Sequence, residues 1–192
     1  MSRTAIQGVS RPQGQAIEAA RQIAIVVGAS LFVALCAHIT IPLMPITPVP
    51  LTVQNFGVLL IALLLGSRRG FAAMAIYLVE GMSGLPVFNP TGPGGVAQLF
   101  GPTGGFLLAY PFVAFVAGYL FERGTRSFLR AVLAGLSAEI ILFVGGLGWL
   151  YMLTHSLAKA AYLGLYWFIA AEVMKIMFAA AIATRWRRFA AK

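Results

Sequence analysis

The chain is dominated by six long apolar stretches, which are separated by short segments rich in Pro, Gly or Arg. A helix that crosses a lipid bilayer needs about 20 predominantly apolar residues, within a range of roughly 17–25. Four stretches reach that length, the second is marginal and the third is shorter. None alternates apolar and polar residues as a barrel strand does, so the pattern predicts an all-α bundle of six transmembrane helices. The stretches are residues 23–41, 51–66, 70–83, 104–121, 131–152 and 162–183.

Two of the connections contain no charged residue. Residues 42–50 are rich in proline, which predicts a stiff, extended link. Residues 84–105 combine many Gly and Pro residues with apolar side chains such as Val87, Phe88 and Leu99. Long loops of this kind are usually functional or disordered, and the apolar side chains favour a folded cap that packs on the ends of the helices.

The overall composition agrees with a membrane protein. Of the 192 residues, 60% are hydrophobic and 10% are charged, whereas a soluble domain carries about 25% charged residues. This composition excludes an ordinary soluble enzyme, a disordered chain and a coiled coil. The single cysteine, Cys36, excludes a framework of intrachain disulfides.

The positive charges indicate an orientation. The net charge is +9, and twelve of the fourteen Lys and Arg residues lie in the two terminal segments and in the second and fourth connections between the apolar stretches. The first, third and fifth connections hold only Lys159. Because cytoplasmic segments carry the excess of Lys and Arg, we expect both termini in the cytoplasm and the cap outside. The twelve residues are Arg3, Arg11, Arg21, Arg68, Arg69, Arg123, Arg126, Arg130, Arg185, Arg187, Arg188 and Lys192.

The same pattern predicts the domain organisation. Residues 1–22 are expected to form a cytoplasmic tail and residues 23–184 a single membrane domain, followed by a basic cytoplasmic tail at residues 185–192. The basic residues sit at the ends of the apolar stretches without an accompanying aromatic stripe, which favours contact with anionic lipid over nucleic acid.

No pattern in the sequence indicates catalysis. The chain contains five Glu and no Asp, and it lacks both a phosphate-binding GxxxxGK[ST] loop and a GxSxG motif. His and Cys residues do not occur at metal-binding spacing. We therefore expect a protein that is not an enzyme, holds no cofactor or metal, and cannot hydrolyse ATP through a phosphate-binding loop of its own.

Three ionisable residues lie inside predicted helices: Glu139 in the fifth, and Glu172 and Lys175 in the sixth. A charge at the centre of a membrane helix costs about 2.5–3.5 kcal/mol on insertion scales, so such residues face protein or a wet cavity. Glu172 and Lys175 are three residues apart and share one helix face. They form either an ion pair that only stabilises the bundle or a polar site for a ligand. Other polar residues are candidates to converge there, namely Gln54, Asn55, Tyr77, Asn89, Gln98 and Tyr110. Of these, we expect Gln54, Asn89, Gln98 and Tyr110 to bind the ligand together with the pair.

The first helix carries small residues at helical spacing, in the pairs Ala24 and Gly28, and Ser30 and Ala34. Pairs of this kind allow close approach of helices in a membrane. They are compatible with docking of a partner membrane subunit.

Several segments have a distinctive sequence: residues 48–54 (PVPLTVQ), 63–70 (LLLGSRRG), 84–88 (GLPVF) and 100–111 (FGPTGGFLLAYP), together with the acid-x-x-Lys pattern of the last helix. Together they resemble the BioY family. The resemblance covers about residues 23–184. The family usually has Asp at the acidic position, where this sequence has Glu172, and a Pro-Gly pair where it has Ala170 and Ala171.

The resemblance implies a function. BioY proteins are the biotin-binding S components of energy-coupling factor (ECF) vitamin transporters. It therefore implies a six-helix S-component fold in the bacterial cytoplasmic membrane, with biotin bound near the outer face. It also implies a transmembrane T subunit and a pair of cytoplasmic ATPases as partners.

Biotin suits the candidate residues. Its ureido ring offers two N–H donors and an acceptor, its thiophane ring is apolar, and its valerate tail ends in a carboxylate. Glu172 is expected to accept a ureido N–H, Asn89 or Gln54 to bond the carbonyl or an N–H, and Lys175 to bond the ring carbonyl or orient Glu172. Two alternatives stay open: an S component for another vitamin, and a structural membrane subunit without transport.

Overall fold

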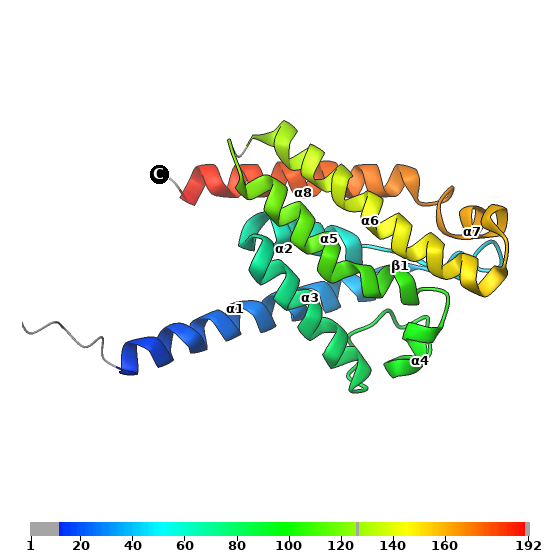
Figure 1. Ribbon diagram of the computed structural model, residues 1–192, viewed down its shortest axis with the longest axis horizontal. Coiled ribbons are helices and arrows are strands. Elements are labelled where there is room, and N and C mark those ends of the chain that lie inside the picture. The colour runs from blue at the N-terminus through cyan, green and yellow to red at the C-terminus, as the bar shows by residue number, and fades with distance from the viewer. Residues whose placement is uncertain (1–11, 126, 191–192) are drawn as a thin grey trace, which may run out of the picture.

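The computed structural model describes residues 12–125 and 127–190. The predicted all-α bundle with six principal helices is confirmed (Figure 1). These helices are α1 (Pro12–His38), α2 (Gln54–Leu65), α3 (Ser67–Met82), α5 (Gly104–Glu122), α6 (Phe128–Thr154) and α8 (Ile169–Ala190). Two short helices, α4 (Gly95–Phe100) and α7 (Leu157–Gly164), and two strands, β1 (Thr40–Ile41) and β2 (Leu51–Thr52), complete the described part of the chain.

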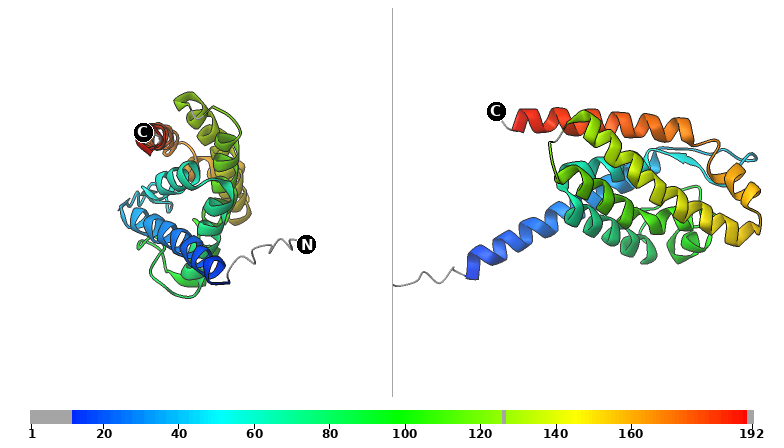
Figure 2. Two further views of the ribbon diagram at one scale, coloured as in Figure 1. Left: turned by 90° about the vertical axis from the view of Figure 1, so that its left-hand side faces the viewer. Right: turned by 45° about the horizontal axis from the view of Figure 1, so that its top comes forward.

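The first helix begins earlier than the apolar pattern indicates. It starts at Pro12, inside the segment expected to be a tail. Proline is favoured in the first turn of a helix, and the Gln, Ala, Glu and Arg residues that follow are good helix formers. Figure 2 shows this part of α1 extending away from the bundle. The expected tail residues 1–11 and 191–192, and Arg126, lie outside the described residues.

The last apolar stretch is not one helix, as the sequence predicted, but two. Helix α7 ends at Gly164, residues 165–168 form turns, and α8 starts at Ile169 with a bend of 49° between the two axes. The end of α7 lies close to α6, since a Cβ at Gly164 would lie 2.5 Å from Leu150 Cδ1. Helix α7 therefore folds closely onto α6, and α8 leaves in a new direction.

Small residues bring the central helices together. A Cβ at Gly105 on α5 would lie 2.4 Å from the carbonyl oxygen of Gly145 on α6. Similarly, a Cβ at Gly118 would lie 2.4 Å from the backbone nitrogen of Ser67 at the start of α3. Because apolar side chains gain nothing by leaving lipid for protein, close packing of this kind drives association of membrane helices. It fixes α5 between α3 and α6.

The outer faces of the helices are apolar. Large side chains such as Leu35, Ile140 and Phe178 are exposed there, which suits lipid. By length and composition, three helical spans in the described residues can cross a membrane, namely Gly14–His38, α5 and α6, and the bent pair of α7 and α8 would form a fourth. Helix α2 is apolar but has only 12 residues. The chain is a multi-pass membrane protein.

The two uncharged connections fold over one end of the bundle, here called the cap end. The residues on either side of the proline-rich link pair as antiparallel strands, with Thr40 opposite Thr52. In the longer connection, Val87, Phe88 and Leu99 are buried, which confirms the folded cap. The opposite end holds the turn between α2 and α3, the connection between α5 and α6, and the end of α8 (Figure 1), where basic residues such as Arg68, Arg123 and Arg185 lie.

Candidate ligand pocket

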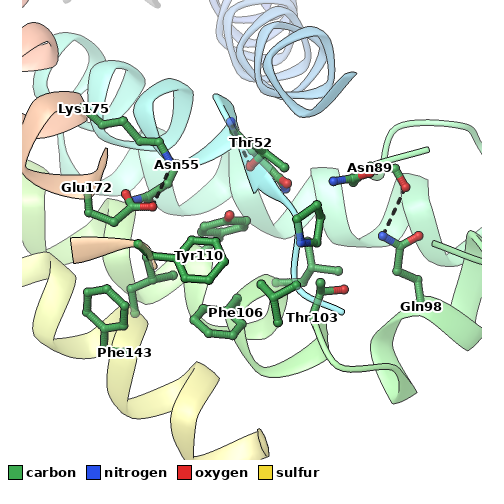
Figure 3. A pocket seen from close by; sticks show the side chains of 16 residues that line it. Thr52, Asn55, Asn89, Gln98, Thr103, Phe106, Tyr110, Phe143, Glu172 and Lys175 are labelled. Atoms are coloured by element: carbon green, nitrogen blue, oxygen red, sulfur yellow. Dashed lines mark hydrogen bonds and ion pairs between the residues drawn. The ribbon is translucent and has the colours of Figure 1, made fainter. Parts of the chain in front are cut away.

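A pocket lies beneath the cap, between α2, α5, α6 and the start of α8. Its empty space, including the part open to solvent, is about 550 Å³. Figure 3 shows Glu172 and Lys175 at one end, Asn89 and Gln98 at the other, and aromatic side chains between them. The pocket is lined by Val49, Pro50, Thr52, Gln54, Asn55, Asn89, Gln98, Thr103, Phe106, Leu107, Tyr110, Leu142, Phe143, Phe168, Glu172 and Lys175.

Glu172 and Lys175 form a buried ion pair, with Lys175 Nζ 2.7 Å from Glu172 Oε1. Their side chains are 8% and 13% exposed. The break before α8 places Glu172 in the first turn of that helix, where a negative charge interacts favourably with the helix dipole. Because an unpaired charge is costly here, the two side chains hold each other in place at the edge of the pocket.

Asn55 on α2 joins this pair to a second carboxyl group. Its Nδ2 donates to Glu172 Oε2 at 2.7 Å and to Glu139 Oε1, on α6, at 2.5 Å. Glu139 does not line the pocket and is buried behind Asn55. The polar end of the pocket is therefore a network of four side chains from three helices.

Gln54 connects the pocket to the cap. Its Nε2 donates to the Tyr77 hydroxyl at 2.9 Å, and that hydroxyl donates to the carbonyl oxygen of Val87 at 2.8 Å. Tyr77 is fully buried and its ring lies 5.4 Å from that of Phe88. This chain of hydrogen bonds fixes the amide of Gln54 and ties α2 to α3 and the cap.

Asn89 and Gln98 mainly hold the cap together. Asn89 Oδ1 accepts hydrogen bonds from the backbone N–H and the hydroxyl of Thr91, both at 2.8 Å, and its Nδ2 donates to Thr40. Gln98 donates to the Asn89 carbonyl and accepts from the Gly94 N–H. Both residues line the pocket, but their polar groups are already bonded within the cap and strand region.

The middle of the pocket is apolar. Phe106 and Tyr110 come from α5, Phe143 comes from α6, and Phe168 comes from the turn before α8. Figure 3 shows Phe106 and Tyr110 between the two polar ends. The arrangement suits a small ligand with an apolar body and polar groups at both ends. No cluster of three or more His, Cys, Asp or Glu side chains that could hold a metal occurs in the part of the chain that is described.

All six residues predicted from the sequence line this one pocket: Gln54, Asn89, Gln98, Tyr110, Glu172 and Lys175. The predicted site list omitted Asn55, Thr52, Thr103 and the apolar wall. Asn55 could have been identified from the sequence, because it stands beside Gln54 at the start of an apolar helix. The apolar residues of the pocket wall could not, since in a sequence an apolar side chain that lines a pocket looks like one that faces lipid. Ligand contacts of the six residues stay a prediction.

Sequence comparison identifies similar proteins. The profile of the BioY family matches residues 6–192. The probable biotin transporter BioY of Pyrococcus horikoshii is 36% identical over 157 residues, which cover 81% of this chain and 91% of that protein. The biotin transporter BioY of Thermotoga maritima is 38% identical over 144 residues, which cover 75% of this chain and 84% of that protein.

Structure comparison gives the same fold. The crystal structure of the S-component for biotin from an ECF-type ABC transporter matches with a TM-score of 0.79 and 22% sequence identity. The match covers 90% of this chain and 93% of that one. The helical arrangement is therefore that of an S-component.

Proposed function

The chain belongs to the BioY family, and from this premise we propose that it is the biotin-binding S subunit of an ECF-type transporter. It captures biotin beneath the cap and delivers it across the membrane. The observation that carries the proposal is the pocket itself, which combines an ion pair at one end, an aromatic middle and a second polar end.

Each part of biotin has a counterpart in this pocket. One N–H group of the ureido ring donates to the carboxylate of Glu172, and Lys175 donates to the ureido carbonyl. The apolar thiophane ring packs between Phe106 and Phe143. The valerate tail extends toward the hydroxyls of Thr52 and Thr103, near the cap. Asn89 contributes by shaping the cap, because its side chain is bonded to Thr40 and Thr91.

The chain works with partner subunits. Its sequence has no phosphate-binding loop, so uptake against a gradient requires ATP hydrolysis by other chains. A transmembrane T subunit and cytoplasmic ATPases supply this energy. The crystal structure with the same fold comes from a transporter of that type, which supports these partners.

The cap end faces the outside of the bacterial cytoplasmic membrane, and the basic end faces the cytoplasm. The support is the gathering of basic segments at one end of the bundle (Figure 1), which follows the positive-inside rule. This orientation opens the pocket toward the side from which biotin arrives and puts both termini in the cytoplasm.

Retention of tritiated biotin by the purified protein tests the function. We expect saturable binding of one biotin per chain, removed by excess unlabelled biotin. A stable protein that retains another vitamin instead would make it an S component of different specificity. A stable protein that retains none of the vitamins tested would leave the structural-subunit alternative.

A further inference from the structure

Asn55 and Glu139 form a buried polar pair whose presence is not explained by the stability of the fold. Both are almost fully buried, at 2% and 6% exposure. Asn55 Oδ1 and Glu139 Oε2 are also buried and have no hydrogen-bond partner in the described structure. Burying polar groups without partners is unfavourable, and apolar residues often replace buried ionic groups without loss of stability. A carboxyl group kept at this depth therefore points to a functional role.

The hydrogen bonds determine the orientation of the Asn55 amide. Both N–H groups of Nδ2 are in use, one toward Glu139 Oε1 and the other toward Glu172 Oε2. The flipped amide would place its oxygen against two carboxyl oxygens, which repel it when they carry no proton. Glu139 thus favours the amide orientation in which Asn55 donates to Glu172.

Glu172 is fixed as a result. Lys175 holds its Oε1 at 2.7 Å, and Asn55 holds its Oε2 at 2.7 Å. A glutamate side chain has three rotatable bonds, and two separate donors on its two oxygens restrict the last of them. A carboxylate that is already oriented loses less conformational freedom when a ligand binds, which strengthens binding.

We infer that Asn55 and Glu139 are positioning residues, which hold the Glu172 carboxylate in the orientation that receives an N–H group of a cyclic urea. The inference rests on the proposed function. Glu139 acts through Asn55 and does not touch the ligand, since it lies outside the pocket lining.

The test compares Asn55→Leu and Glu139→Leu with a matched control. Glu80→Gln on α3 is suitable, because Glu80 is also a carboxyl group within a helix, is bonded to Ser30, and does not line the pocket. Affinities for tritiated biotin and for biotin methylated on a ureido nitrogen are measured for each purified protein, together with the melting temperature without ligand.

We expect both leucine variants to bind biotin about tenfold or more weakly. The melting temperature should be unchanged or raised in Glu139→Leu, but lowered in Asn55→Leu, which leaves the buried Glu139 carboxyl group without its donor. We also expect them to discriminate less between biotin and its N-methyl analogue, because the N–H acceptor is no longer fixed. The Glu80→Gln protein should keep both affinities. Asn55→Gln, which retains a longer amide, should recover part of the discrimination.

Two results would overturn the inference: full biotin affinity in stable Glu139→Leu protein, or an equal loss for both ligands, which indicates a general structural effect. A wild-type protein that does not bind biotin would instead refute the proposed function, so the two failures are distinguishable.

Discussion

Lys175 Nζ lies 2.7 Å from Oε1 of Glu172, one turn earlier on α8, and both side chains line the pocket, with Glu172 buried and Lys175 partly buried. The pair is not isolated, because the second oxygen of Glu172 accepts a hydrogen bond from Asn55 on α2. It therefore connects the last helix to α2 at one end of the pocket.

Loss of either member of this pair should weaken ligand binding. In Lys175→Ala and Glu172→Ala, one charged group loses its partner, and a hydrogen bond to a charged group contributes about 1.5–3 kcal/mol, or roughly tenfold to a hundredfold in affinity. Glu172→Asp keeps the carboxylate and should lose far less. Tritiated biotin binding and melting temperature are measured on the same preparation. Normal affinity in stable Lys175→Ala protein would show that the pair is only structural.

The orientation can be tested by labelling. We expect a cysteine at Thr91, which is exposed in the cap, to react with an impermeant maleimide in intact cells. The background is Cys36→Ser, and Cys36 is itself buried. A cysteine at Thr125, exposed at the opposite end of the bundle, serves as control and should react only after the membrane is disrupted. The reverse pattern would contradict the proposed orientation.

The small residues of α1 give a prediction about the partner subunit. Ala24 and Gly28 lie on the exposed face, and a Cβ at Gly28 would meet nothing within 4 Å. Ser30 and Ala34 are buried inside the bundle, so this second pair is not accessible to a partner subunit in this structure. We expect Gly28→Trp to reduce co-purification of the T subunit while biotin binding stays normal.

The matched variant is Ala34→Trp, which should reduce the yield of folded protein because the side chain has no room. Undiminished co-purification with Gly28→Trp would mean that the T subunit docks on another face.

The hydrogen bonds of Tyr77 should contribute to the stability of the cap. Tyr77→Phe leaves the Gln54 amide and the Val87 carbonyl without a bond that they have in the wild type. An unsatisfied buried polar group costs about 1–3 kcal/mol, so we expect a lower melting temperature in detergent. Tyr151→Phe, at an exposed position on α6, is the control and should melt as the wild type does. Equal melting of all three proteins would show that the cap does not depend on this hydroxyl.

Much of the fold was determined by local composition. Long apolar segments in a chain with few charges leave lipid as the only suitable surroundings, so the helical membrane fold and the folded cap could be predicted. The sequence also identified Glu172 and Lys175, because their spacing on a helix makes them neighbours whatever surrounds them. The break at Gly164 could not be predicted, since no proline interrupts the apolar stretch of residues 162–183.

The sequence by itself determined the class of protein, the six principal helices and the residues that carry charge at membrane depth. Only the tertiary structure decided what these residues contact. Asn55, Glu139 and Glu172 are far apart in the sequence and meet because α8 packs against both α2 and α6. Likewise, only the tertiary structure shows that Asn89 and Gln98 hydrogen-bond within the cap as well as line the pocket. The physical reason is that a hydrogen bond requires atoms about 3 Å apart, and such distances between helices follow from side-chain packing, which a linear pattern of residues does not specify.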